Sequence, residues 1–140
     1  MIALRFVLDT NVIVSAALRP DGLQRTALVI AVTKPASLYI SEAILSEYEE
    51  VLARPRFGIP KGERHQILQF IRRRARFVQP SATLRVAGDA TDDKFLECAE
   101  ASRADYLVTG NVKNFPKFWK GTKVVTAREL VEIVAPHRPV

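Results

Sequence analysis

The chain has 140 residues, with 21 lysines and arginines, 15 aspartates and glutamates, and a formal net charge of +6 at pH 7. A chain of this length buries about 68–70% of its unfolded surface, so we expect one domain with an ordinary hydrophobic core. A single cysteine, Cys98, excludes an internal disulfide and a multi-cysteine zinc site, and two histidines argue against a histidine-rich metal site.

The N-terminus and the charge balance indicate a compartment and a class of ligand. No signal-peptide core follows Met1, and no apolar run approaches the roughly 20 residues of a membrane helix, so we expect a soluble, cytoplasmic protein with no membrane partner. A pI near 9.8 is typical of nucleic-acid-binding domains. Net charge also serves solubility, so the nucleic-acid interpretation depends on the site residues below.

Short apolar patterns typical of strands alternate with helical periodicity along the whole chain. The predicted strands are residues 5–8, 38–40, 76–78, 106–108 and 123–125. The predicted helices are residues 11–18, 23–33, 42–53, 62–74, 92–102 and 127–134. This alternation predicts an α/β fold in three layers, with a short parallel sheet between helices, and no linker divides residues 1–140 into smaller domains.

The first predicted strand ends at an acidic residue. Asp9 follows the apolar residues 6–8 and precedes Thr10 and Asn11. Ligands of open α/β sheets bind beyond the carboxyl ends of the strands, so Asp9 is a candidate binding residue. The alternative is that Asp9 or Thr10 only caps the next helix.

The predicted helix 42–53 carries two glutamates beside its apolar face. Glu47 lies at one edge of that face and Glu49 at the other, whereas the face itself consists of Ile44, Leu45, Tyr48, Val51 and Leu52. Most glutamates on such a helix are simply solvated. Periodicity alone cannot choose between these two.

The densest basic run ends the predicted helix 62–74, and a sparser group of lysines follows near the last strand. Each group is more often a solvated surface than a binding surface. Combined with the acidic candidates, however, they suggest contacts to a polyanion. The candidate nucleic-acid-binding residues are Arg72, Arg73, Arg74, Lys113 and Lys117.

Two adjacent aspartates begin the predicted helix 92–102. At about 100° per residue, Asp92 projects onto the apolar face that contains Phe95, Leu96, Cys98 and Ala99, and Asp93 lies off its edge. An inward-facing acid requires a partner or a metal, so Asp92 is a candidate ligand and Asp93 a supporting or capping residue. The alternative is capping, with Thr91 as the N-cap and both aspartates favourable in the first turn.

The residues around the fourth predicted strand supply the last candidate. Asn111 follows residues 106–108 through Thr109 and Gly110, although Gly-Asn is also ordinary turn chemistry. Three aromatic residues among the nearby lysines could stack on bases, but we expect at least two of them to anchor the last strand: Phe115, Phe118 and Trp119. Cys98 lies on a buried helix face and is expected to be a small apolar residue, not a nucleophile.

The candidate oxygen ligands share one chemical feature. Acids that converge at a sheet edge without cationic partners repel one another, and a divalent cation is the usual means of neutralising them. Hard carboxylate and amide oxygens suit Mg²⁺ or Mn²⁺ better than zinc. We therefore expect a divalent-metal site that acts on a polyanionic substrate.

Four segments of the sequence together resemble the PIN-domain ribonucleases, especially the VapC-like toxin components of toxin–antitoxin pairs. They are residues 7–12 (VLDTNV), 41–47 (SEAILSE), 91–99 (TDDKFLECA) and 104–111 (ADYLVTGN), in the order and spacing of that family. The resemblance covers essentially the whole chain. It implies a short parallel sheet between helices.

The resemblance also implies roles for individual residues. Asp9, Glu47 and Asp92 match the family's catalytic, metal-binding acids, which selects Glu47 over Glu49. The family's fourth acid aligns with Asn111, so one carboxylate is replaced by a neutral amide ligand. Thr10, Asp93 and Thr109 are expected to support these ligands, Thr10 and Thr109 through hydroxyl hydrogen bonds.

The expected function is therefore a Mg²⁺- or Mn²⁺-dependent endoribonuclease, with an antitoxin protein as a partner and a homodimer as the assembly that the resemblance implies. One alternative is a PIN-like RNA-binding module whose catalysis has lapsed, for which Asn111 is the support. A receiver-like phospho-acceptor domain is a weaker alternative, because the strands 38–40 and 76–78 do not end in aspartate.

Overall fold

The computed structural model describes residues 3–81 and 92–134. Six strands are found in this part of the chain: β1 (Arg5–Leu8), β2 (Ser37–Ile40), β3 (Arg76–Phe77), β4 (Tyr106–Val108), β5 (Phe118–Trp119) and β6 (Thr122–Val125). Its helices are α1 (Thr10–Leu18), α2 (Leu23–Val32), α3 (Glu42–Leu52), α4 (Lys61–Arg74), α5 (Asp93–Ser102) and α6 (Ala127–Val134). Two 3₁₀ turns, η1 (Pro55–Phe57) and η3 (Val112–Asn114), follow α3 and β4.

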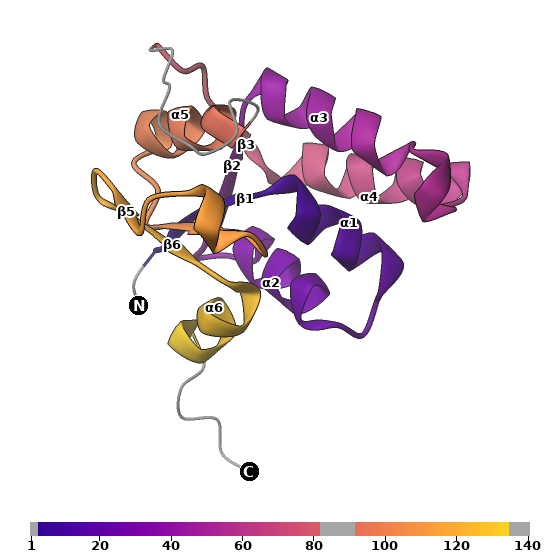
Figure 1. Ribbon diagram of the computed structural model, residues 1–140, viewed down its shortest axis with the longest axis horizontal. Helices are drawn as coiled ribbons and strands as arrows, with labels where there is room; N and C mark the ends of the chain where they lie inside the picture. The colour runs from indigo at the N-terminus through magenta and orange to yellow at the C-terminus, as the bar shows by residue number, and fades with distance from the viewer. Residues whose placement is uncertain (1–2, 82–91, 135–140) are drawn as a thin grey trace.

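The described strands form one sheet in the order β3-β2-β1-β4-β6-β5. All neighbouring strands are parallel except β5, which pairs antiparallel with β6 at one edge. The predicted three-layer α/β/α fold is confirmed: α5 packs on β1, β2 and β4, and α2 packs on β1 and β2 from the other side, next to α6 (Figure 1). The edge strand β5 was not predicted, because two residues give no readable alternation.

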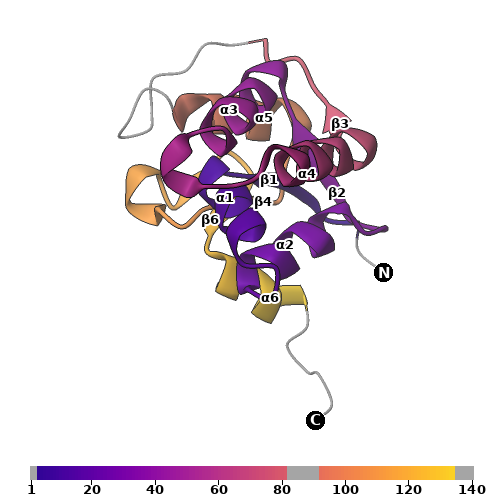
Figure 2. The same ribbon diagram turned by 90° about the vertical axis from the view of Figure 1, so that its right-hand side faces the viewer.

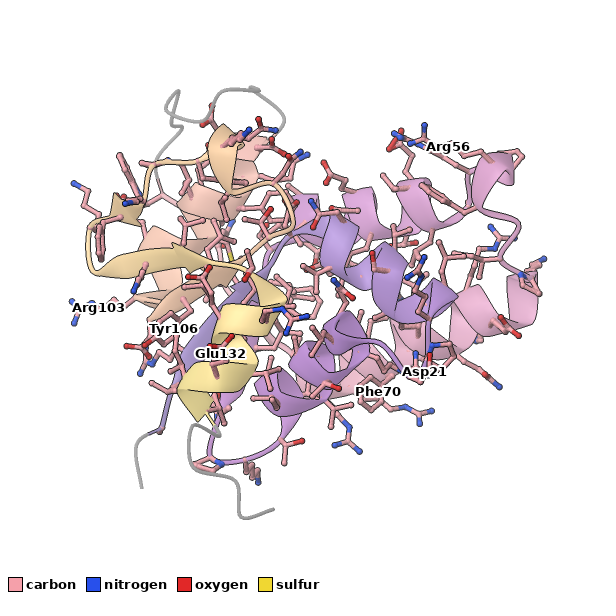
Figure 3. The ribbon with its side chains drawn as sticks, turned by 60° about the horizontal axis from the view of Figure 1, so that its bottom comes forward. Asp21, Arg56, Phe70, Arg103, Tyr106 and Glu132 are labelled. Carbon is pink, nitrogen blue, oxygen red and sulfur yellow. The ribbon has the colours of Figure 1, made fainter. Side chains whose placement is uncertain are left out.

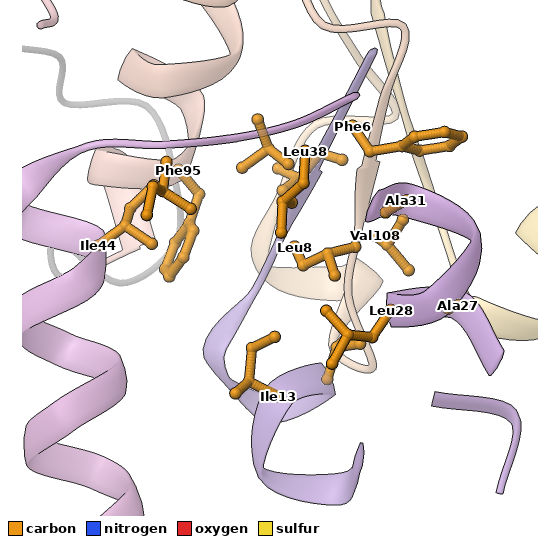
Figure 4. Packing of buried hydrophobic residues seen from close by; sticks show 14 of the residues in the cluster. Phe6, Leu8, Ile13, Ala27, Leu28, Ala31, Leu38, Ile44, Phe95 and Val108 are labelled. Atoms are coloured by element: carbon orange, nitrogen blue, oxygen red, sulfur yellow. The ribbon is translucent and has the colours of Figure 1, made fainter. Parts of the chain in front are cut away.

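The core fills both spaces between the sheet and its helices. Phe95 of α5 and Ile44 of α3 lie on one side of the strands, and Leu28 of α2 lies on the other (Figure 4). All three side chains are buried. Phe115 is also buried and Trp119 packs against the core, which confirms that two of the three nearby aromatics are anchors.

Helix α3 runs beside α1 and α4, at the end of the sheet where β1 finishes (Figure 2). Tyr48 of α3 is fully buried, and its hydroxyl donates a hydrogen bond of 2.5 Å to the carbonyl of Leu8. Burial raises the pKa of Tyr48 well above its usual 10, so the hydroxyl stays protonated as a donor. This bond holds α3 against the carboxyl end of β1.

The expectation for Cys98, a buried residue that is not a nucleophile, is also met. Cys98 is buried, and burial raises its pKa from 9.0 to about 12, so its thiolate is inaccessible at neutral pH. No helix in residues 3–81 and 92–134 combines the length and the apolar character that crossing a bilayer requires.

Candidate active site

A cleft of about 920 Å³ opens beyond the carboxyl ends of β1 and β4, between α1 and α3. These two strands are neighbours, with Leu8 opposite Val108, so the residues that follow them meet at one edge of the sheet. The cleft is lined by all four residues that the sequence suggested as ligands: Asp9, Glu47, Asp92 and Asn111.

Asp9 is the most buried of these ligands, with 5% of its surface exposed. Its Oδ1 accepts a hydrogen bond of 2.7 Å from the backbone N–H of Thr10, and so it caps α1. Its Oδ2 accepts from the hydroxyl of Thr109 at 2.7 Å and from the amide of Asn11 at 3.2 Å. The two interpretations of Asp9 are thus compatible, because one carboxylate both caps the helix and faces the cleft.

Burial sets the protonation of Asp9. Desolvation raises its pKa from 3.8 to about 6, the hydrogen bond from Thr109 opposes that rise, and the nearby charges of Asp92 and Glu47 add to it. An acid of this kind is costly to ionise in the folded protein, and a cation bound beside it would remove that cost.

Glu47 makes one contact of the kind expected, with the hydroxyl of Thr10, and one that the sequence did not predict, with Lys94. One of its carboxylate oxygens accepts a hydrogen bond from the hydroxyl of Thr10, and the other pairs with the ammonium of Lys94 at 2.5 Å. The side chains of Lys94 and Glu47 are only 22% and 18% exposed. The expectation of acids without cationic partners is therefore wrong at Glu47, whose charge Lys94 already neutralises.

The choice between the two glutamates of α3 follows from their surroundings. Glu47 faces the cleft, whereas Glu49 lies on the outer surface and pairs with Arg72 of α4 at 3.1 Å. The selection of Glu47 by family resemblance thus agrees with its position in the structure.

The two aspartates before α5 are arranged differently from the helical projection. Asp93 is buried with 4% of its surface exposed, whereas Asp92 is half-buried. The projection does not apply to Asp92, because α5 begins at Asp93 and Asp92 is the N-cap position. It is wrong for Asp93, whose burial helical spacing alone does not explain. Asp92 nevertheless lines the cleft, and its Oδ2 accepts a hydrogen bond of 3.4 Å from Asn114. The expected N-cap, Thr91, lies outside the described residues.

The loop after β4 brings Asn111 to the rim of the cleft. Its backbone N–H donates to the hydroxyl of Thr109 at 2.9 Å, and the N–H of Gly110 donates to the side-chain oxygen of Asn11 at 3.0 Å. Asn11 therefore bridges this loop to Asp9, a role that sequence reasoning missed. The only signal was its position two residues after the acid.

The donor chemistry of the cleft fits a hard divalent cation. Asp9, Asp92 and Asn111 contribute carboxylate and amide oxygens, which suit Mg²⁺ and Mn²⁺. In the arrangement seen here, no group of three or more histidine, cysteine, aspartate or glutamate side chains in residues 3–81 and 92–134 forms a metal-binding cluster. Glu47 is engaged by Thr10 and Lys94, so it would become a ligand only after Lys94 released it.

None of the predicted basic residues lines the cleft. Arg72 is paired with Glu49, and the guanidinium of Arg74 lies over the ring of Phe70 at 4.8 Å. The residues that line the cleft do not include Arg72, Arg73, Arg74, Lys113 or Lys117. Two arginines that the sequence did not single out, Arg54 and Arg56, do line it, and Figure 3 shows Arg56 projecting from the segment after α3.

Comparisons with known proteins add a family and a fold. The family model described as PIN domain matches residues 5–113. The uncharacterized protein MJ1680 of Methanocaldococcus jannaschii is 27% identical over 143 residues, which cover 94% of this chain and 92% of that protein.

Two solved structures have a similar fold. VapBC2 of Rickettsia felis, bound to a DNA fragment from its promoter, aligns with a TM-score of 0.63 and 19% identity, over 88% of this chain and 98% of that one. PAE2754 of Pyrobaculum aerophilum aligns with a TM-score of 0.58 and 18% identity, over 97% and 100%. At these identities the similarity concerns the fold.

Replacing Asp9 with asparagine should stabilise the metal-free protein at neutral pH. A carboxyl group whose pKa is raised from 3.8 to about 6 holds its proton more tightly when folded, so stability falls as the pH rises from about 4 to about 6. At pH 7 the cost is on the order of 3 kcal/mol, and asparagine removes part of it. Urea unfolding in chelator between pH 4 and pH 8 measures the effect.

The exposed Asp21, in the loop after α1, supplies the matched control for that experiment. Asp21→Asn removes the same charge but should leave the pH dependence of wild type unchanged. If Asp9→Asn loses stability between pH 4 and pH 6 as steeply as wild type, ionisation of Asp9 is not the cause of that loss.

Replacing Lys94 with methionine should destabilise the metal-free protein by about 1–2 kcal/mol, because it leaves Glu47 unpaired beside Asp9 and Asp92. The added negative charge should also tighten Mn²⁺ binding, so Mn²⁺ should raise the melting temperature more in this variant than in wild type. Melting curves with chelator and with Mn²⁺ measure both effects.

Lys120→Met is the control, because it breaks an exposed pair with Glu100 at 3.9 Å and changes the net charge equally. Equal responses of the two variants would show that Lys94 influences the cleft only through net charge.

Proposed function

This chain belongs to the PIN-domain family, and on that basis we propose that it is a Mg²⁺- or Mn²⁺-dependent endoribonuclease that hydrolyses phosphodiester bonds of RNA. PIN domains are generally nucleases, which supports hydrolase activity. The cleft residues support the divalent metal, and the net charge of the chain supports RNA as the substrate.

The observation that carries the proposal is the meeting of Asp9, Glu47, Asp92 and Asn111 at one cleft, although they come from four separate segments. Asp9 is costly to ionise where it lies, and buried acids with raised pKa values in a cleft are typical of functional sites. The net charge of +6 in a chain with this acidic cleft favours a polyanionic substrate.

The side chains of the cleft have distinct roles in the proposed reaction. Asp9 and Asp92 would hold the cation, and Asn111 would be an outer, neutral ligand. A bound divalent cation would polarise the scissile phosphate and lower the pKa of water at the site. Glu47, which the Thr10 hydroxyl orients, would position the attacking water or the cation.

Thr109, Asn11 and the N–H of Thr10 fix the Asp9 carboxylate in place before substrate arrives. Such preorganisation lowers the cost of reaching the reactive geometry. Asp93 is proposed as a supporting residue, since it is buried in the first turn of α5 next to Asp92.

The proposed biological role is that of the toxin in a toxin–antitoxin pair, acting in the cytoplasm as a homodimer with an antitoxin partner. The structural similarity to VapBC2, which was solved bound to a promoter DNA fragment, supports this role. Co-expression with the product of a neighbouring gene, followed by a pull-down and a growth assay, tests the pairing directly.

A second candidate function is an RNA-binding module without catalysis. Two observations favour it: Asn111 supplies no charge to the cleft, and Lys94 engages Glu47. Both candidates bind RNA, so cleavage is the property that separates them.

Cleavage of a labelled single-stranded RNA should require Mn²⁺ or Mg²⁺ and should stop on addition of a chelator. Asp92→Asn should reduce the rate at least about 100-fold, because removing one ligand carboxylate weakens the hold on the cation. Glu97→Gln, in the helix α5 that follows Asp92 and outside the cleft lining, is the matched control and should retain activity. RNA binding without cleavage under saturating metal would select the second candidate.

A further inference from the structure

The cleft does not end at the acidic residues but continues as a groove between α1 and α3. Its walls follow helical spacing, with Thr10, Val14 and Leu18 on α1 and Ala43, Glu47 and Val51 on α3. We call this the α1–α3 groove. It connects the carboxyl end of the sheet to the turn η1.

The far end of the groove has the opposite charge from its start. Arg54 and Arg56 line it there together with Glu50, which leaves one net positive charge. At the sheet, Asp9, Asp92 and Glu47 outnumber Lys94. Glu47 and Arg54 are seven residues apart on and just beyond α3, which corresponds to roughly 10 Å at about 1.5 Å per residue. The arginines are therefore far enough from the acids to contact a different phosphate of the same strand.

Both guanidinium groups are available to a ligand. Arg54 pairs with Glu50 at 3.4 Å, but the two side chains are 44% and 68% exposed, and such exposed pairs contribute little. Arg56 is exposed, and its guanidinium lies over the ring of Phe57 at 4.8 Å. That contact orients Arg56 without using its hydrogen-bond donors.

We propose that the α1–α3 groove is the binding path for single-stranded RNA, with Arg54 and Arg56 holding the phosphate backbone on one side of the cleavage point. This inference rests on the proposed function, and it names the residues that bind the substrate. The acids bind the reacting phosphate through the cation, and the two arginines fix the register of the strand.

The size and lining of the groove favour a single RNA strand. A volume of about 920 Å³ is at the upper end of small-ligand pockets, so a short stretch of one strand fits inside it. Ser15 and Ser46 line the groove, and their hydroxyls are suitable partners for a ribose 2′-hydroxyl, which DNA lacks.

The basic run on α4 is a weaker candidate for the same role. Neither Arg72 nor Arg74 lines the groove. Their contacts with Glu49 and Phe70 are as exposed and as close as those of Arg54 and Arg56, so these contacts do not distinguish the two sets. Arg54 and Arg56 are fewer, but they share one cavity with the acids. Position relative to the acids, and not the density of charge along the sequence, selects them.

The test compares two double variants that remove equal charge, Arg54→Gln with Arg56→Gln and Arg72→Gln with Arg73→Gln, both in the Asp9→Asn background to prevent cleavage. Binding of a fluorescent single-stranded RNA of about 12 nucleotides is measured by anisotropy over a range of salt concentrations. We expect the first pair to weaken binding about tenfold and to reduce the salt slope by about 1.4, and the second pair to change neither.

The possible results distinguish the role of the α1–α3 groove from the proposed nuclease function. Equal losses in the two pairs, or a loss only in the α4 pair, would overturn the groove assignment while leaving RNA binding intact. Failure of the parent protein to bind RNA would contradict the proposed function and the inference together. A DNA strand of the same sequence that binds as tightly would overturn recognition of the ribose. Melting temperatures matching the parent confirm that the variants are folded.

Discussion

The pairing of β1 with β4 is the constraint on which the site depends. Because Leu8 lies opposite Val108, the chain leaves both strands at the same edge, and the Thr109 hydroxyl reaches the Asp9 carboxylate. The Tyr48 hydroxyl donates a hydrogen bond to the carbonyl of Leu8 and so holds α3 at this junction. Glu47 precedes Tyr48 in α3 and is therefore held at the same place. A shift of one residue in the β1–β4 register would separate Asp9 from Thr109 and turn alternate side chains to the wrong face.

Lys94 and a divalent cation would both neutralise acidic charge at this junction, and they would compete only for Glu47. Within the protein, Lys94 neutralises Glu47, while Asp9 bears a raised pKa because burial and two acids oppose its ionisation. A divalent cation would relieve Asp9 but would compete with Lys94 for Glu47. Acids that would strengthen binding of the ion therefore lower the free energy of unfolding of the metal-free protein, a relation that is common at functional sites.

The sequence predicted the helices and strands well where they were long and periodic. It also predicted, from the place of Asp9 after a buried strand, that this residue lies at the carboxyl edge of the sheet. It failed at a helix boundary, since Asp92 precedes α5 at the N-cap position, without a side-chain capping hydrogen bond, and does not lie on the helix face. Lys94 could not be found from local pattern, because its partner Glu47 is 47 residues away. Arg54 and Arg56 were also missed, because only the packing of α1 on α3 makes the groove that they line. Dense charge on α4 was the more visible signal, and Glu49 partly neutralises it.

The central claim is that the Asp9 cleft binds a divalent cation, and anomalous diffraction from crystals grown with Mn²⁺ tests it most directly. We expect an anomalous peak in the cleft, with the carboxylates of Asp9 and Asp92 among the ligands of the ion. The same crystals show whether Lys94 has released Glu47. A cleft without a peak under saturating Mn²⁺, or a peak bound by neither aspartate, would contradict the account.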